Sequence, residues 1–404
     1  MSISGRHKSL VTCLGSVLLL GSLIIATHRS AQWFIPQHAI RQDFIEYWAS
    51  GRLFLSGENP YTESAVAALQ QNLGRQTPLY MWNGPWLLTA SLPLYCFDFP
   101  TAAGVWLGLN LLWVGISLLL LRQLIAKPSG QAFTTIAQLC LLLSFYPIWN
   151  SIALGQLGTL LLLGITLVLS GLKFQRPAHC AIGLIILSLK PHLVLLLAPL
   201  LLVGVLHNRP RQILSYTFGI GAVLLLATSL ISPPSLSGWI SQISTPPLQY
   251  VGATAIGFLR AQLVSKVSIQ TLALVNLVIP LLMVVAITGW TLAKRHQRQV
   301  ISTTDLLIWL PLAVLFSPYG WVFDFALLLP SYFFAAAQLE NANGARKYAG
   351  AFLLLGSQAA IPLGISWGYT EHHQYFWVPL IIWLVGVSSS QNKTRSGLGD
   401  RRKT

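Results

Sequence analysis

The chain has 404 residues, of which 54% are hydrophobic and only 9% are charged, and its mean hydropathy is +0.64. Soluble globular proteins carry about 25% charged residues, so this composition excludes an ordinary water-soluble enzyme. The formal net charge is +15, because 25 lysines and arginines stand against 10 acidic residues. The four cysteines form no CxxC pair, so neither a disulfide framework nor a zinc site is indicated.

Apolar runs recur along the whole chain, and a bilayer-spanning helix needs about 17–25 residues. The first run, residues 10–28, follows Arg6 and Lys8 and lacks a small-residue cleavage site, which predicts a retained signal-anchor. The further predicted spans are residues 101–121, 133–149, 157–171, 178–189, 192–206, 213–231, 270–293, 305–317, 322–338, 348–366 and 376–388. The sequence therefore predicts an all-α polytopic membrane protein with about 12 transmembrane helices.

The basic residues predict the orientation, because segments rich in Lys and Arg stay in the cytoplasm. With the N-terminus inside, eighteen of the 25 basic residues fall on cytoplasmic segments, and both termini are cytoplasmic. The net charge is then explained by the orientation of the protein in a cell (inner) membrane. It does not indicate a nucleic-acid partner. We predict one transmembrane domain over residues 1–388, with an outer loop and juxtamembrane helices at 29–100, and a basic cytoplasmic tail at 389–404.

Two apolar segments need separate treatment under this orientation. Residues 85–97 are too few for a full crossing, and a crossing there would move the basic loop 122–132 outside, so we predict a helix on or in the outer leaflet. Residues 178–206 have basic segments on both sides and must cross an even number of times. We predict two short helices with Lys190-Pro191-His192 at the outer turn, and one long tilted helix is the alternative.

The longest polar segment, residues 29–84, falls on the outer side. Its string DFIEYWASGRLFL places apolar and polar residues on opposite helical faces, which predicts an amphipathic helix on the membrane surface. The alternative is that this segment is a solvated surface helix. The apolar face holds Phe44, Trp48, Gly51 and Leu55, and the polar face holds Gln42, Asp43, Glu46 and Ser50.

The longer string DFIEYWASGRLFLSGENPYT resembles the first outer-loop signature of glycosyltransferase family 87. That signature joins Asp-Phe, an aromatic residue, Ala and Gly-x-x-Pro-Tyr, matched here by Asp43, Phe44, Tyr47, Ala49, Gly57, Pro60 and Tyr61. Shorter matches follow in order at Asn83-Gly84-Pro85, Leu92-Pro93-Leu94, Asn150 with Leu154-Gly155-Gln156, Gly183 to Lys190-Pro191, and Ser317-Pro318-Tyr319-Gly320-Trp321 with Asp324. All of them fall on the predicted outer face. Some members have His after the last Trp, and this chain has Phe323-Asp324, so no such His role is carried over.

The resemblance implies a C-type glycosyltransferase architecture. It also implies inverting transfer of a hexose, mannose in known members, from a polyprenyl-phosphate donor to a hydroxyl of a glycan or glycolipid. The active site would lie at the outer face, next to membrane lipid, with the lipid-linked sugar as co-substrate. No further cofactor and no metal are expected, and the chain has no nucleotide-binding motif.

Such a transfer needs a base, cationic donors for the leaving phosphate, and an apolar groove for the prenyl chain. In the resemblance the first-loop acid, Asp43, is the catalytic base; the alternative is that it only caps its helix. Lys190 is the candidate donor for the phosphate, because a Lys between apolar helices is costly, and the alternative is a snorkelling side chain. His192 and Arg260 are further donor candidates, with a structural turn histidine and a snorkelling arginine as their alternatives.

Six other residues are candidates for binding the sugar or the acceptor. The polar ones have the alternative of satisfying helix ends or remaining solvated, and the aromatic ones that of belonging to an interfacial belt. The candidates are Glu46, Tyr47, Gln156, Tyr319, Trp321 and Asp324.

Two other function classes remain open from the sequence. A transporter or flippase of a lipid-linked sugar would share the outer polar site, but inverted repeats are expected of it and none is visible. A non-catalytic assembly subunit would need neither Asp43 nor Lys190.

Overall fold

The computed structural model describes residues 43–125, 135–245, 248, 250–340, 342 and 344–400. Within these residues the regular secondary structure is entirely helical, which confirms the all-α class. The predicted signal-anchor at residues 10–28 lies outside the described residues.

The helices alternate between long apolar rods and short segments. In chain order they are α3 (Phe44–Leu55), α4 (Glu63–Asn72), α5 (Trp86–Ala90), η2 (Leu92–Cys96), α6 (Phe99–Ile125), α7 (Thr135–Ser144), α8 (Tyr146–Leu154), α9 (Gly158–Lys173), α10 (Pro177–Leu187), η3 (Pro191–Leu193), η4 (Leu195–Leu197), α11 (Ala198–His207), α12 (Pro210–Ile231), α13 (Ser235–Ser244), α14 (Ala255–Leu263), α15 (Ile269–His296), α16 (Thr303–Leu315), η5 (Val322–Leu328), α17 (Leu329–Glu340), α18 (Ala345–Ser366), η6 (His372–Tyr375) and α19 (Trp377–Asp400).

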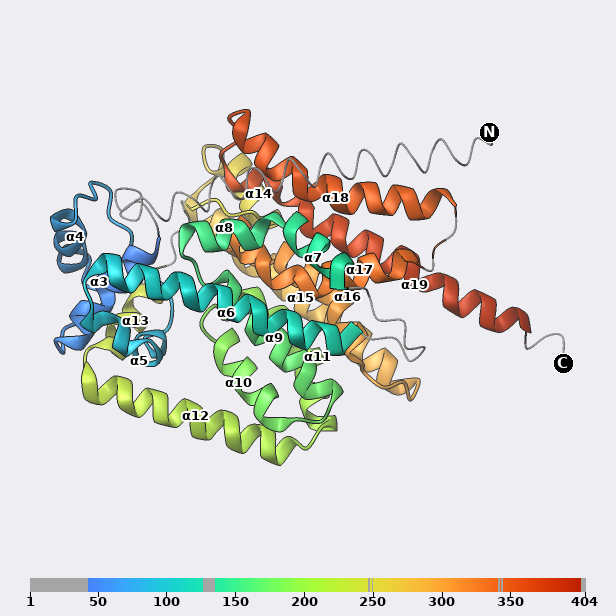
Figure 1. Ribbon diagram of the computed structural model, residues 1–404, viewed down its shortest axis with the longest axis horizontal. Coiled ribbons are helices and arrows are strands. Elements are labelled where there is room, and N and C mark those ends of the chain that lie inside the picture. Colours follow the sequence, from blue (N-terminus) through green and yellow to red (C-terminus); the bar gives the residue numbers. More distant parts are fainter. Residues whose placement is uncertain are drawn as a thin grey trace.

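The long helices run roughly along the longest axis of the molecule (Figure 1). We call the end that carries α3, α4, α5 and α13 the site end. The opposite end, where α6, α9, α11 and α15 finish, is the basic end, since Lys173 there donates to the carbonyl of Leu124 and Arg295 lies beside His207. The ends of α6, α9, α11 and α15, with several of the basic residues predicted to be cytoplasmic, therefore lie opposite α3, and the orientation itself remains a prediction.

The centre of the bundle is α9, which is buried along nearly its whole length. It packs on α10, α6 and η5, and a larger core around α9, α16, α17 and α19 adjoins a smaller core around α3, α5 and α6. Gly183 of α10 allows the close approach of α9, because a Cβ atom there would lie 2.5 Å from the carbonyl oxygen of Gly164. Small residues have this role wherever apolar helices pack closely.

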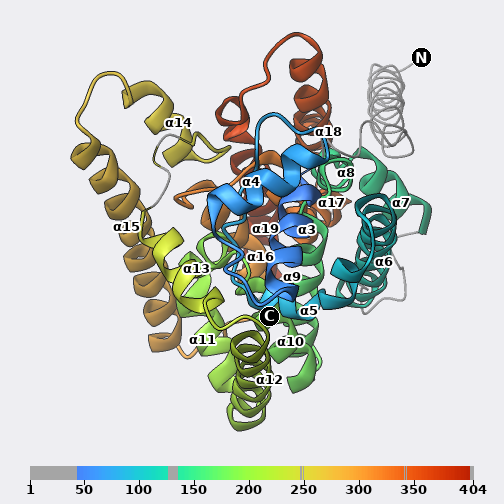
Figure 2. The same cartoon turned by 90° about the vertical axis from the view of Figure 1, so that its left-hand side faces the viewer.

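Membrane insertion is consistent with the length and apolarity of the helices. Among the described residues, five segments are long and apolar enough to cross a bilayer (α6, α12, α15, the segment Val322–Leu339, and α18), and four shorter apolar helices accompany them. The helices α12 and α15 lie at the edge of the bundle (Figure 2). Large apolar residues on them are exposed, with Phe218 and Leu277 at 73% and 65%. The chain is a multi-pass helical membrane protein, while the count of twelve crossings remains a prediction.

Several predicted segments are confirmed with small changes of boundary. Residues 85–97 form two short helices, α5 and η2, and no rod that could cross a bilayer. The 178–206 region is broken at Lys190, which has φ −135° and ψ 68°. Pro191 disfavours the helical conformation of the residue before it, so α10 and α11 are separate helices.

Two expectations were wrong. Residues 133–149 are no single span, because α7 ends at Ser144 and α8 starts at Tyr146, where Pro147 in the first turn cannot continue the preceding helix. The predicted surface helix α3 is instead buried on most sides. The ring of Phe44 stacks on Trp106 of α6 at a centroid distance of 5.0 Å, and Ser50 on the supposedly polar face is fully buried.

Candidate active site

Asp43 stands at the start of α3, where the chain meets the turn between α8 and α9. Its backbone N–H donates to the carbonyl of Leu154 (2.8 Å), and its carboxylate Oδ2 accepts a bond from Gln156 Nε2 (2.9 Å). The Tyr47 hydroxyl donates to Gln156 Oε1 (2.8 Å), which orients the amide group. The Asp43 side chain makes no capping bond to α3, so the alternative that it only caps its helix is wrong.

The surroundings of Asp43 favour its use as a base. Burial raises the pKa of Asp43, and this effect is partly offset by the bond from Gln156 and by the positive charges of Arg75 and Lys190. Glu46 follows one helical turn later, and burial together with the negative charge of Asp43 raises its pKa to about 8. At neutral pH Glu46 is therefore mainly protonated and can donate a hydrogen bond.

Lys190 and Asp324 form a buried ion pair, with 2.7 Å between Nζ and Oδ1. The other oxygen of Asp324 accepts the backbone N–H of Trp321 (3.1 Å), which caps η5. The ammonium also lies 4.9 Å from the ring centroid of Phe323 and 5.8 Å from that of Trp321. Lys190 therefore points into the protein and does not snorkel. Asp324 holds it there, and a contact of Asp324 with sugar stays a prediction.

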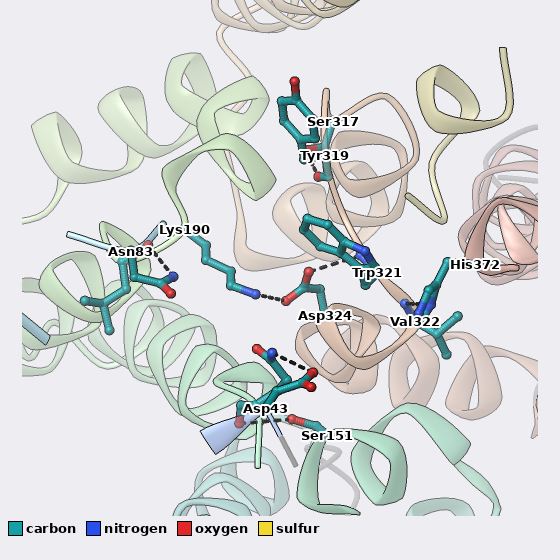
Figure 3. A network of polar contacts seen from close by, with 12 residues as sticks. Asp43, Asn83, Ser151, Lys190, Ser317, Tyr319, Trp321, Val322, Asp324 and His372 are labelled. Carbon is teal, nitrogen blue, oxygen red and sulfur yellow. Dashed lines mark hydrogen bonds and ion pairs between the residues drawn. The ribbon is translucent and has the colours of Figure 1, made fainter. Parts of the chain in front are cut away.

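Figure 3 shows the Asp43 carboxylate near the Lys190–Asp324 pair, with the three residues contributed by the start of α3, the turn after α10, and η5. The positive charge of Lys190 acts on both Asp43 and Glu46, lowering the pKa of each. Residues far apart in the sequence thus share one site at the site end of the bundle.

A second cationic cluster adjoins this network through Tyr319. The guanidinium of Arg260 lies 4.3 Å from the ring centroid of Tyr319, and the His192 ring meets the same ring edge-on at 6.3 Å. Arg260 is fully buried and donates from Nη1 to Asn276 (3.2 Å). Its Nε and Nη2, and Nε2 of His192, have no hydrogen-bond partner among the described residues. Burying a guanidinium whose hydrogen-bonding capacity is only partly used is costly, so this cluster is suited to an anion.

His192 lies in the turn between α10 and α11, where burial lowers its pKa to about 4. The ring is therefore neutral at pH 7 and offers one N–H. Its backbone carbonyl accepts the hydroxyl of Ser317 (3.0 Å), which joins this turn to the Ser317–Trp321 segment. The structure thus brings the three predicted phosphate donors together. Lys190 and His192 lie in the same turn, and Arg260 and His192 contact the same Tyr319 ring.

Three contributors were not assigned a role from the sequence. Asn83 donates to the carbonyl of Leu189 (3.1 Å) and so fastens the loop before α5 to the Lys190 turn. Phe323 faces the ammonium, and Arg75 acts on both carboxylates of α3. The sequence features that could have pointed to them were the Asn83-Gly84-Pro85 motif, the aromatic residue beside Asp324, and an arginine in the outer segment that holds Asp43.

An apolar cavity of about 480 Å³ lies beside the Lys190 turn. Its walls come from α5, η2, α6, α9, α10 and α12, and they include Trp86, Trp106 and Leu189. Leu189 immediately precedes Lys190, so the cavity and the cationic turn are neighbours. Among the described residues, no group of three or more His, Cys, Asp or Glu side chains is arranged to hold a metal ion.

These features define a class: a multi-pass helical membrane protein with a buried site of carboxylates and cations at one end of its bundle. The sequence model of glycosyltransferase family 87 matches residues 80–318, more than half of the chain. The chain belongs to glycosyltransferase family 87, which confirms the resemblance and makes it a membrane glycosyltransferase rather than a transporter or an assembly subunit. No curated protein and no solved structure matches it.

The matched region covers part of the site. It contains Gln156, Lys190, His192 and Arg260. The carboxylate helix and the late motif lie outside it, namely Asp43, Glu46, Tyr47, Tyr319, Trp321 and Asp324. The roles of these residues therefore depend on the geometry described above.

Proposed function

We propose that this enzyme transfers a hexose from a polyprenyl-phosphate donor to an acceptor hydroxyl at the outer face of the cell membrane, with inversion. The observation that carries the proposal is that Asp43 and Lys190 lie near one another at the site end (Figure 3), so that the charge of Lys190 acts on the Asp43 carboxylate. A base and a cation in one site are the two groups that displacement from a lipid phosphate requires.

Asp43 is the proposed base. Its carboxylate takes the proton of the acceptor hydroxyl while that oxygen attacks the anomeric carbon and the bond to the phosphate oxygen breaks. The electron pair leaves with the phosphate, so the products are the inverted glycoside and polyprenyl phosphate. A raised pKa makes Asp43 a stronger base than an exposed aspartate, and Gln156 holds its orientation.

The leaving phosphate is stabilised in this proposal by Lys190, His192 and Arg260. Two of these carry buried nitrogen atoms without partners among the described residues, so an incoming phosphate satisfies them. Lys190 is bound to Asp324, and the phosphate shares or replaces that contact. Aromatic rings on one side of the ammonium limit its exchange with water.

The prenyl chain is proposed to leave the site through the apolar cavity lined by Trp86, Trp106 and Leu189. This cavity lies next to the cationic turn, and a lipid phosphate needs its charged and apolar parts in adjoining places. The sugar is placed between the two carboxylates of α3 and the rings of Tyr319 and Trp321. There the protonated Glu46, Tyr47, Gln156 and Asp324 are its proposed polar neighbours.

The test is transfer by the purified full-length protein from a polyprenyl-phosphate hexose, with analysis of the anomeric configuration of the product. Wild type is expected to form the inverted glycoside and to release polyprenyl phosphate. Asp43→Asn should lose about 10²–10⁴-fold in rate, whereas Glu58→Gln, a change at another acid of the same outer segment, should not. A correctly folded Asp43→Asn protein with wild-type rates would remove Asp43 as the base. Transfer only from a nucleotide sugar would remove the lipid donor.

A further inference from the structure

A second polar pocket, of about 260 Å³, lies at the basic end, remote from the site described above. It is formed by the end of α11 and by the turn that follows α15. Its cationic and imidazole side chains are Arg295, Arg298 and His207, and its apolar lining includes Val203, Leu206 and Val300. A pocket that combines cationic and apolar side chains matches a molecule with both characters.

Within the described part of the chain, no acidic side chain neutralises the positive charges of this pocket. Among the described residues neither Arg295 nor Arg298 forms an ion pair. The nearby carboxylate, Asp305, is occupied by Lys294 at 2.6 and 2.7 Å and by the backbone and hydroxyl of Ser302. The pocket therefore offers two guanidinium groups to an external anion.

The backbone at Arg298 adds an independent observation. Arg298 has φ +56°, a left-handed conformation that glycine adopts easily and other residues adopt at a cost. The turn is closed by bonds from Arg298 N–H to the Arg295 carbonyl (2.9 Å) and from Gln299 N–H to the Lys294 carbonyl (3.0 Å). Gln175 and Arg209 have positive φ in two other turns between helices, and at all three positions glycine would close the turn with less strain.

We propose that this pocket binds the headgroup of an anionic phospholipid from the leaflet that adjoins the basic end. The phosphodiester is held by Arg295 and Arg298, with an N–H of His207 as a further donor, and an acyl chain runs along Leu206 and Val300. Both apolar residues are exposed, by 53% and 61%. Basic pockets between transmembrane helices on the cytoplasmic side recognise such headgroups, and the predicted orientation makes this leaflet the cytoplasmic one.

A simpler reading is that these arginines only set the topology or oppose the helix dipole of α15. Arg295 and Arg298 are exposed, as either role requires, but neither role needs a pocket in which both arginines meet the apolar end of α11. A soluble phosphate compound would likewise gain nothing from the apolar lining. The inference is independent of the proposed transferase mechanism.

The experiment uses the full-length protein in nanodiscs of phosphatidylcholine with increasing phosphatidylglycerol, and measures retained lipid by native mass spectrometry. Wild type is expected to retain phosphatidylglycerol over phosphatidylcholine. Arg298→Gly and Arg295→Gln should each weaken this preference about fivefold, the effect of one cation at a membrane surface. Arg298→Gly suits its backbone position and should fold at least as well as wild type.

Arg211→Gln is the matched control, because Arg211 is exposed at the same end and does not line the pocket. Its lipid preference should equal that of wild type. Equal retention of both lipids by wild type would overturn the proposal, as would an unchanged preference in Arg298→Gly and Arg295→Gln. Displacement of phosphatidylglycerol by millimolar inorganic phosphate would show that the pocket takes a soluble anion instead, which also overturns it.

Discussion

The ammonium of Lys190 lies 2.7 Å from Oδ1 of Asp324, although 134 positions separate the two residues in the chain. Both side chains are buried, and the energy of such a pair is largely cancelled by the loss of hydration, so it is weak evidence for a purely stabilising role. The pair lies beside the turn that carries His192 and within the electrostatic range of Asp43. This position indicates a functional role for the pair.

The first prediction separates the stability of this pair from its function. Asp324→Asn leaves the charge of Lys190 without its anion and should lower the free energy of unfolding by about 3–5 kcal/mol. The double variant Lys190→Met with Asp324→Leu should recover most of that loss, because an apolar pair avoids the cost of buried charge. Thermal unfolding in detergent measures both effects.

The same double variant should remain inactive in the transfer assay, since the proposed phosphate donor is gone. A stable and fully active double variant would show that the pair is structural. Lys266→Met, a change at an exposed lysine, should affect neither stability nor transfer and is the control for removal of a positive charge.

The second prediction concerns the ionisation of Glu46, whose pKa is raised from 4.5 to about 8. A carboxyl group with a higher pKa in the folded state destabilises the fold as pH rises from the ordinary value to the raised one. Glu46→Gln mimics the protonated form. Its gain in Tm over wild type should therefore grow between pH 5 and pH 8 and level off above pH 8.

Activity distinguishes Glu46 from Asp43 in the same pH series. At pH 7 Glu46→Gln should retain transfer, because glutamine also donates a hydrogen bond, while Asp43→Asn should not transfer. Glu63→Gln, at an exposed acid of the outer loop, should show no growing gain in Tm. A Tm difference for Glu46→Gln that is constant across the pH range would contradict the raised pKa.

The third prediction tests the contact that brings η5 to α9. A methyl group at Gly158 would overlap the carbonyl oxygen of Phe323. Gly158→Ala should therefore cost about 1–3 kcal/mol of stability, and it should reduce transfer, because Gln156 and Asp324 lie on either side of this contact.

The control is Gly108→Ala in α6, where an added Cβ meets no atom within 4 Å. Alanine favours the helix at such a position by up to about 1 kcal/mol, so this variant should be as stable as wild type or slightly more so. Equal stability of the two alanine variants would mean that the contact at Gly158 does not constrain the site.

The fourth prediction tests the orientation. Cys96 is exposed near the site end, and Gln297 is exposed at the basic end. In intact cells a membrane-impermeant maleimide should label wild type but not Cys96→Ser. In the Cys96→Ser background, Gln297→Cys should be labelled only after the membrane is permeabilised. The reverse pattern would place the site in the cytoplasm and contradict an outer-face reaction.

The helices were largely predictable because they depend on local properties. The observed α6, α9, α12, α15 and α18 each lie within a few residues of a predicted apolar run. The break at Lys190 was also foreseen, since proline acts on the residue next to it. Burial of α3 was missed because it depends on Trp106 and Tyr95, which belong to other elements.

By itself the sequence determined that this is an all-helical membrane protein and which polar residues are unusual enough to consider, and it predicts an orientation from the basic residues. Those properties follow from apolar runs and local charge, and each can be read from a short window of the chain. Only the tertiary structure decided that Gln156 binds Asp43, that Asp324 binds Lys190, and that Tyr319 lies between Arg260 and His192. These pairings arise from helix packing, in which a missing Cβ at Gly158 or Gly183 sets the distance between segments far apart in the chain.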